Sequence, residues 1–286
     1  MIKYAVNLWG KDIEIETEES RDSYLTNFGR ATLENRYMSS GESYQDLFAR
    51  VATHYADDSQ HAQRLYDYIS KLWFMPATPI LSNGGTKRGF PISCFLNEAE
   101  DSMQGIVDLW NENVWLASKG GGIGSYWGNL RGQGEKVGQA GKTSGVVPFI
   151  RVMDSLTLAI SQGSLRRGSA ACYLPVWHPE IEEFVDLRRP TGGDPNRKAL
   201  NLHHGVVLSD DFMRAVEEDK SWALKSPKDG SIQKTTKARS LWIKILTARI
   251  ETGEPYLLFI DRVNDAIPYH HKMAGLQVKM SNLCSE

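Results

Sequence analysis

Residues 146–177, VVPFIRVMDSLTLAISQGSLRRGSAACYLPVW, contain the pattern that decides the fold. From Val146 to Ile160 the apolar residues follow helical spacing, and from Ala171 to Trp177 they form a short, β-rich apolar run. The polar, glycine-containing segment Ser161–Ser169 connects the two. A helix that alternates with apolar strands is typical of βαβ units, which predicts a parallel sheet.

The same alternation extends on both sides of this stretch. Four more β-rich segments occur, at Ile92–Leu96, Ile123–Leu130, Leu202–Leu208 and Tyr256–Ile260. Further helical patterns lie at Ser102–Ala117, Glu180–Leu187 and Lys237–Ile250. We therefore expect an α/β fold in which ligand sites gather at the carboxyl ends of the strands. Residues 219–236 are polar and lysine-rich, and they predict a surface excursion.

The N-terminal part has a different pattern. Residues 1–19 predict a peripheral strand or arm, and the apolar spacing from Arg21 to Phe74 predicts a small helical region. Asp57-Asp58-Ser59 interrupts that region and supplies capping residues for the next helix. We expect two domains, with an arm and helical region at residues 1–75 and an α/β region at residues 76–286.

Composition excludes several classes of protein. The 286 residues are 41% apolar and 24% charged with a net charge of −2, so a sequence-independent grip on nucleic acid is not expected. The three cysteines are odd in number and far apart, which argues against a disulfide framework and for a reducing, cytoplasmic setting. No apolar run approaches the roughly 18 residues of a membrane span, so no membrane partner is expected. The seven histidines form no ligand cluster, so no metal site is expected.

Two glycine-rich stretches suggest a nucleotide nearby. Gly120–Gly124 lets the backbone approach a ligand closely, although an ordinary glycine-rich turn explains it equally well. Gly134–Gly145 is not a Walker motif, because position 136 is lysine where the motif requires glycine. A flexible loop beside a nucleotide remains open, and its phosphate partners would be Arg131, Lys136 and Lys142.

The connection Ser161–Ser169 carries two residues that suit nucleotide recognition. Gln162 can read a base edge, and Arg166 can stack on a base or hold a phosphate. The alternative is a plain solvated loop.

The three cysteines call for separate interpretations. Cys284 lies between Asn282 and Glu286 at alternate positions, so an amide, a sulfur and a base could converge on one ligand. An ordinary polar C-terminus is the alternative. Cys94 and Cys172 lie in strand-like segments, where a cysteine is usually a small buried apolar residue. We assign that role to Cys172, and to His178 a capping or core role.

Taken in order, the motifs resemble the large catalytic subunit of ribonucleotide reductase from about Met75 to Glu286. They are Met75-Pro76-Ala77-Thr78-Pro79, Ser93-Cys94, Asp101-Ser102, Gly122-Ile123-Gly124, Ser161-Gln162-Gly163 with Arg166, Pro175-Val176-Trp177-His178 and Asn282-Leu283-Cys284-Ser285-Glu286. The resemblance implies an α/β fold in which an N-terminal helical region precedes the first five-stranded half of a ten-stranded α/β barrel. A loop that carries the radical cysteine would pass through the middle of the barrel.

Two departures from the family shape our expectations. The sequence ends at the tip of the cysteine loop, so we expect a split subunit whose second half-barrel comes from another polypeptide. The helical region begins near the N-terminus, so we expect no ATP-cone and no on/off activity site.

The resemblance implies a role for each catalytic candidate. Cys284 would hold a transient thiyl radical and take the 3′ hydrogen of the ribose. Glu286 would be the base at the 3′ hydroxyl, and Asn282 would hydrogen-bond the ribose hydroxyls. Cys94 would face the 2′ position, help water leave and form a disulfide with a cysteine outside this sequence.

The resemblance also implies binding residues. Substrate contacts are expected from Thr78, Ser93, Gly121 and Gly122. A deoxynucleoside triphosphate or ATP effector is expected at Asp101, Ser102 and Arg131. A specificity loop that relays effector identity is expected at Gln162, Gly163 and Arg166.

The implied partners follow the family. They are the C-terminal half of the catalytic subunit, a radical-generating, metal-containing small subunit, thioredoxin or glutaredoxin as external dithiol reductant, and a second copy of the assembled subunit in a homodimer. Adenosylcobalamin is the alternative radical source, and a ribonucleoside diphosphate is favoured over a triphosphate as substrate. Three alternatives remain open: a nucleotide-binding regulatory module without turnover, one half of a precursor joined by protein splicing, and a truncated piece of a longer chain.

Overall fold

The computed structural model describes residues 1–139, 141–162, 166–167, 169–284 of the chain. The chain forms two compact units, Met1–Ser93 and Cys94–Glu286, and each is described by itself. Gly163 and Glu286, two of the predicted site residues, lie outside the described residues.

The first unit is a small helical bundle with a hairpin packed on it. Its elements are β1 (Ile2–Val6), β2 (Asp12–Glu16), the 3₁₀ helix η1 (Glu19–Tyr24), α1 (Asn27–Arg36), α2 (Tyr44–Tyr55), α3 (Ser59–Ser70) and α4 (Thr78–Asn83). The predicted arm is this antiparallel hairpin, in which Ile13 and Ile15 alternate inward into the helical core. Asp58 caps α3 by accepting a hydrogen bond from the His61 amide, as the sequence predicted.

The boundary between the units lies later in the chain than the sequence suggested. Residues 76–93 belong to the first unit, where Leu81 of α4 is buried in the helical core. The predicted division after Met75 follows a change in sequence texture, whereas the structural division follows the packing of α4.

The second unit is built on a five-stranded, all-parallel sheet in the order β13-β10-β9-β4-β3. The strands are β3 (Cys94–Glu98), β4 (Gly122–Tyr126), β9 (Ser169–Pro175), β10 (His203–Leu208) and β13 (Tyr256–Phe259). Each falls on one of the five β-rich segments that the sequence predicted, so the half-barrel expectation for strand number and direction is confirmed.

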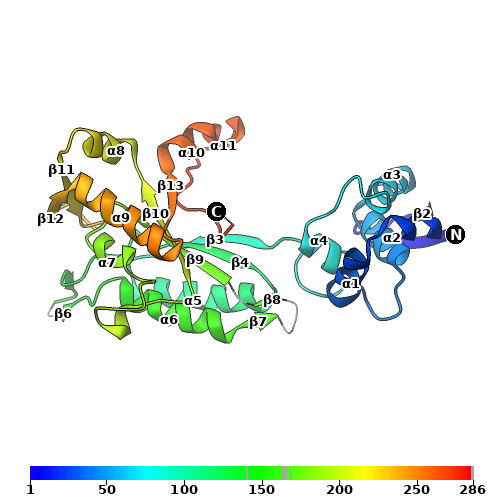
Figure 1. Ribbon diagram of the computed structural model, residues 1–286, viewed down its shortest axis with the longest axis horizontal. Coiled ribbons are helices and arrows are strands. Elements are labelled where there is room, and N and C mark those ends of the chain that lie inside the picture. Colours follow the sequence, from blue (N-terminus) through cyan, green and yellow to red (C-terminus); the bar gives the residue numbers. More distant parts are fainter. Residues whose placement is uncertain (140, 163–165, 168, 285–286) are drawn as a thin grey trace. The chain divides into compact units, whose positions relative to one another are not determined.

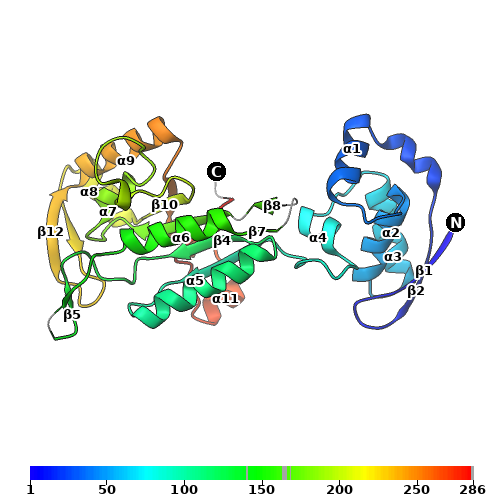
Figure 2. The ribbon, with the colours of Figure 1, turned by 90° about the horizontal axis from the view of Figure 1, so that it is seen from below.

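Helices cover one face of this sheet. They are α5 (Met103–Ser118), α6 (Val147–Ala159), α7 (Ile181–Val185), α8 (Asp210–Glu217) and α9 (Ala238–Thr252). We call the face they cover the outer face; it carries Ile123, Cys172 and Val206, which are buried in the main core. Figures 1 and 2 show α5 and α6 lying along this face.

The opposite face, which we call the inner face, follows from strand register. Leu96, Gly124, Ala171 and His203 are successive partners across β3, β4, β9 and β10, so they point to the same side. The helices α10 (Ile260–Ala266) and α11 (Tyr269–Met273) and the C-terminal segment lie on this side in Figure 1.

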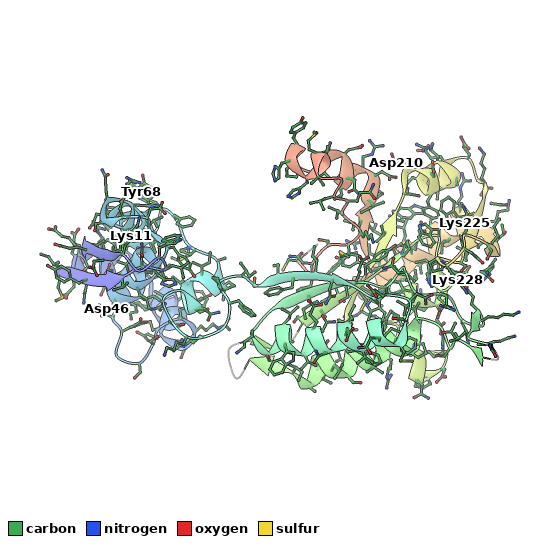
Figure 3. The ribbon with its side chains drawn as sticks, turned by 180° about the vertical axis from the view of Figure 1, so that it is seen from behind. Lys11, Asp46, Tyr68, Asp210, Lys225 and Lys228 are labelled. Atoms are coloured by element: carbon green, nitrogen blue, oxygen red, sulfur yellow. The ribbon has the colours of Figure 1, made fainter. Side chains whose placement is uncertain are left out.

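Small hairpins decorate the second unit. They are β5 (Lys136–Val137) with β6 (Gly141–Lys142), β7 (Ser161–Gln162) with β8 (Arg166–Arg167), and β11 (Ser221–Lys225) with β12 (Ile232–Lys237), and a 3₁₀ helix, η2 (Pro195–Arg197), precedes β10. The predicted surface excursion is therefore the β11–β12 hairpin, and Figure 3 shows Lys225 and Lys228 on it. Over the part of the chain that the structure describes, no helix is both long and apolar enough to cross a membrane.

Candidate functional site

The inner face of the sheet holds the C-terminal segment at very short range. A Cβ added to Gly124 would lie 1.8 Å from the carbonyl oxygen of Ser281. No side chain fits in that space, so glycine at this position lets the segment lie directly on β4. The close approach at Gly124 is to the protein's own chain, and the approach to a ligand that we expect at Gly120–Gly124 stays a prediction.

Tyr173 fixes the same segment from the next strand. Its hydroxyl donates a hydrogen bond of 2.7 Å to the carbonyl oxygen of Asn282. Met280 is buried nearby with Tyr126, Tyr173 and Tyr256 in a cluster on the inner face. The backbone around Asn282 is therefore held between an apolar anchor and a tyrosine hydrogen bond.

An ion pair adds a third attachment. The Lys279 ammonium lies 2.7 Å from the Glu98 carboxylate of β3. The Lys279 hydrogen bond, helped by Asn129, outweighs the effect of burial and lowers the pKa of Glu98. On the neighbouring strand, burial and the Glu98 charge raise the pKa of Tyr126 to about 12, so its phenol stays protonated at neutral pH.

The turn at the end of the segment presents Cys284. The Cys284 amide donates a 3.2 Å hydrogen bond to the side-chain oxygen of Asn282, which fixes the two residues relative to each other. Cys284 is exposed. This bond joins the Asn282 side chain to the backbone of Cys284, so the convergence of amide, sulfur and carboxylate on one ligand stays a prediction, and Glu286 lies outside the described residues.

Cys94 is exposed at the start of β3. Its partner on β4 is Gly122, and it lies on the inner face together with Leu96, two residues further along β3. The interpretation of Cys94 as a buried apolar residue is therefore excluded. Cys172, in contrast, is buried on the outer face and burial raises the pKa of its thiol, which confirms its core role.

The predicted substrate residues divide between the two units. Thr78 and Ser93 lie in the first unit, where the Thr78 hydroxyl is 3.1 Å from the hydroxyl of Tyr37. Gly121 packs against the ring of Phe95, and its amide donates to the carbonyl oxygen of Leu116. Its N–H is thus used in ending α5, so a substrate contact at Gly121 would use its carbonyl or its lack of a side chain.

The predicted effector residues converge on a second site. Asp101, Ser102 and Arg131 line a pocket of ≈350 Å³ together with Lys142 and Thr143. The Arg131 guanidinium binds Asp101 through Nε at 2.8 Å and Nη2 at 2.7 Å, and its Nη1 donates to the Lys136 carbonyl. Ser102 caps α5 by accepting a 2.9 Å hydrogen bond from the Gly105 amide.

The two sites lie at opposite ends of the strands. The pocket residues Asp101 and Arg131 follow β3 and β4, at the carboxyl ends where ligand sites were expected. Cys94 and Gly122 instead begin those strands, so the tendency of ligand sites to gather at carboxyl ends of strands does not apply to them.

The described residues on the two sides of the predicted specificity loop pair as short antiparallel strands. Gln162 of β7 pairs with Arg166 of β8, which places the backbones of these residues side by side. Gly163 lies outside the described residues.

Several residues of the site were not predicted. Tyr173 and Lys279 were missed because their partners are distant in sequence, 109 residues apart in the case of Tyr173 and Asn282.

His178 was correctly assigned a core role: it is fully buried, and burial lowers its pKa to about 4. Within the described ranges, no group of three or more histidine, cysteine or acidic side chains could hold a metal ion.

This geometry, a parallel half-barrel with a cysteine segment lying on its inner face, defines a class of protein that comparison can identify. The family model "Ribonucleotide reductase, barrel domain" matches residues 92–286, and "Ribonucleotide reductase, all-alpha domain" matches residues 23–89. The chain belongs to the ribonucleotide reductase large-subunit family.

Individual relatives agree. The chain is 40% identical over 279 residues to the ribonucleoside-diphosphate reductase large subunit of Invertebrate iridescent virus 6, covering 95% of this chain and 28% of that protein. It is 37% identical over 328 residues to the corresponding subunit of Invertebrate iridescent virus 3, covering 95% and 51%. The solved class Id ribonucleotide reductase alpha subunit of Actinobacillus ureae superposes with a TM-score of 0.78 at 27% identity, covering 95% of this chain and 46% of that one. The chain spans about half or less of the length of these proteins.

Proposed function

We propose that this chain supplies the first half-barrel, the radical-cysteine segment and the specificity site of a catalytic subunit that reduces ribonucleoside diphosphates to deoxyribonucleotides. One observation carries the proposal. The segment that ends at Cys284 is fixed on the inner face by Gly124, Tyr173 and Glu98, the face on which Cys94 is also exposed.

The proposed reaction assigns a balanced role to each residue. A thiyl radical at Cys284 takes the 3′ hydrogen, and Glu286 takes the 3′ hydroxyl proton. Asn282 holds the ribose hydroxyls. The 2′ hydroxyl leaves as water after it gains a proton, and Cys94 with a second cysteine supplies the two electrons by forming a disulfide. Cys284 finally returns the hydrogen atom to the 3′ carbon, which restores the C–H bond and regenerates the thiyl radical.

The substrate and effector assignments rest on the resemblance of the motifs to the ribonucleotide reductase large subunit. Thr78, Ser93, Gly121 and Gly122 are proposed to contact the substrate. A deoxynucleoside triphosphate or ATP is proposed to bind the pocket at Asp101, Ser102 and Arg131. The hairpin at Gln162, Gly163 and Arg166 is proposed to relay effector identity.

The partners are proposed from the relatives. The second reducing cysteine is not available here, because Cys172 is buried on the outer face. A second half-barrel would supply it, on a separate polypeptide or on the same one. A metal-containing small subunit is proposed as radical source and a thioredoxin or glutaredoxin as reductant. Two copies of the assembled subunit would form a dimer, in the cytoplasm.

The experiment is reduction of a ribonucleoside diphosphate by the assembled subunit, with small subunit and dithiol. We expect Cys284→Ser and Cys94→Ser to abolish turnover, and Cys172→Ala, the matched control, to retain it. Pull-down of the chain from its source with mass spectrometry then establishes whether the second half-barrel is a separate polypeptide.

Other results would redirect the proposal. Turnover that persists in Cys284→Ser would remove the radical role. Binding of deoxynucleotides without any turnover would instead favour a regulatory module. Activity that requires adenosylcobalamin and no small subunit would replace the proposed radical source.

A further inference from the structure

The nucleotide pocket depends on the shape of one loop. This pocket loop, residues 131–139 and 141–146, leaves the sheet after β4 and returns at α6, and it supplies half of the pocket's lining residues. The loop is rich in glycine, which loses much conformational freedom when it is ordered. A pocket built on such a loop needs a device that holds the two ends of the loop together.

Glu180, the residue before α7, binds both ends with a single atom. Its Oε2 accepts hydrogen bonds from the backbone N–H of Gln133 at 3.1 Å and from the backbone N–H of Val146 at 2.8 Å. One carboxylate oxygen can accept two such bonds. Its Oε1 accepts from Nη2 of Arg197 at 3.2 Å, and Nη1 of Arg197 donates to the carbonyl oxygen of Ser144 at 3.2 Å.

His178 supports the same arrangement from two residues earlier. Its Nε2 lies 2.7 Å from the carbonyl oxygen of Leu130, and its Nδ1 accepts from the Glu180 amide at 3.1 Å. A neutral imidazole that carries its proton on Nε2 satisfies both bonds. Burial lowers the pKa of His178 to about 4, which keeps the ring neutral.

Two glycines of the pocket loop fit closely against this group. A Cβ on Gly145, whose φ is +89°, would lie 2.3 Å from a carboxylate oxygen of Glu180. A Cβ on Gly132 would lie 2.8 Å from the side chain of Pro179. Both loop ends therefore reach His178-Pro179-Glu180 only because they lack side chains.

The carboxylate of Glu180 is buried at the junction of the two loop ends. Glu180 is only 6% exposed, and burial raises its pKa even though the Val146 amide and Arg197 act in the opposite direction. Losing this carboxylate alone would leave the Gln133 and Val146 backbone N–H groups and Arg197 without their acceptor.

We propose that Glu180 is a positioning residue of the deoxynucleotide pocket, which fixes both ends of the pocket loop and so sets the affinity for the effector. The proposal rests on the effector function proposed above. Glu180 does not line the pocket, so it acts through the loop that presents Lys142 and Thr143.

The test uses the assembled catalytic subunit and 2′-deoxythymidine 5′-triphosphate (dTTP) as the probe. Glu180→Met keeps the shape and removes the acceptors, whereas Glu180→Gln keeps one oxygen for the two amides. Because two amide hydrogen bonds are lost, we expect dTTP affinity to fall about tenfold or more in Glu180→Met and about threefold or less in Glu180→Gln. Glu183→Gln is the control, since Glu183 also pairs with Arg197 but contacts no pocket-loop amide.

A second readout separates the positioning role from the effector function. Hydrogen exchange in the pocket loop should accelerate in Glu180→Met without any nucleotide, and in Gly145→Ala, which displaces the loop end while keeping the carboxylate. The positioning role is overturned if Glu183→Gln loses as much dTTP affinity as Glu180→Met. It is also overturned if hydrogen exchange in the pocket loop is unchanged in both Glu180→Met and Gly145→Ala. If the unaltered subunit binds no dTTP while exchange responds as expected, the effector function fails and the positioning role for a nucleotide pocket falls with it.

Discussion

At the residue scale, the contact between Gly124 and Ser281 makes the sharpest prediction. Gly124→Ala introduces a Cβ that would lie 1.8 Å from the Ser281 carbonyl oxygen, so the C-terminal segment must leave its position on β4. We expect turnover to fall by about a hundredfold or more, since active-site displacements of about 1 Å already cost that much. Reductase activity and protease sensitivity of residues 276–284 measure the effect.

Tyr173→Phe is the graded companion of that change. It keeps the ring on the inner face and removes only the hydroxyl that donates to Asn282. One hydrogen bond of about 1 kcal/mol corresponds to a loss of about five-fold in activity. A Gly124→Ala enzyme as active as Tyr173→Phe would show that the segment is not required in this position.

His178 makes a prediction about pH. Its pKa falls from 6.5 to about 4 on folding because burial disfavours the charged ring. A lowered histidine pKa means that the unfolded state binds the proton first, so stability is complete above pH 6.5 and is lost as pH falls toward 4. The full difference is about 3 kcal/mol.

Urea unfolding of His178→Gln between pH 7 and pH 4.5 checks this sign. We expect the variant to be less stable than the native chain at pH 7 but to lose less stability as the pH is lowered. His270→Gln, a substitution at an exposed position of α11, is the control and should keep the native pH dependence. Parallel curves for His178→Gln and the native chain would contradict the assignment.

At the scale of elements, the N-terminus of α5 separates two roles of Ser102. The hydroxyl caps the helix by accepting from the Gly105 amide, and the residue also lines the nucleotide pocket. Ser102→Ala should lower the free energy of unfolding by about 1 kcal/mol, because it removes the cap. Ser102→Asp keeps a capping oxygen, so stability should be preserved.

The same pair of variants tests the pocket. A carboxylate at position 102 would repel a nucleotide phosphate, so we expect dTTP binding to weaken at least about tenfold in Ser102→Asp. Unfolding curves and equilibrium binding separate the two effects. Unchanged dTTP affinity in Ser102→Asp would place the phosphates away from α5.

The elements differ in how far the sequence predicts them. The five sheet strands could be found because each is a short apolar run between turn signals, and their long helices because they have regular apolar spacing. The sequence predicts the β11–β12 hairpin only as a polar excursion, since Leu224 is the one buried residue of its two strands. The short helix α8 was missed, although Ser209 as a cap and the spacing of Phe212, Ala215 and Val216 carry its signal.

The candidate site shows a different limit. Asn282 and Cys284 could be singled out because their spacing alone joins an amide to a sulfur. That Tyr173 binds Asn282 and that Gly124 admits Ser281 depends on how distant strands are ordered in the sheet. Local patterns carry no information about such partners, so only the resemblance to a known family could suggest that these segments meet.

At the scale of the whole molecule, the sheet of the second unit has two edge strands, β3 and β13. The ladder of the sheet ends at an edge strand, and such an edge readily pairs with a further strand. On the inner face of β3, the apolar side chain of Leu96 is 53% exposed. Both features fit the proposed second half-barrel, which would continue the sheet and cover this face.

Hydrogen exchange tests that arrangement directly. Amides in β3 and β13 should exchange more slowly when the second half-barrel is present, whether joined or added as a separate chain, because the added strands would extend the ladder and cover both edges. Amides in β9 are the internal control, since this strand is already paired with β4 and β10 on its two sides. Protection that rises in β9 as much as in the edges would indicate general stabilisation, and unchanged edges would show that the second half-barrel pairs elsewhere. Slowing confined to β3 and β13 would support closure of the barrel around the Cys284 segment.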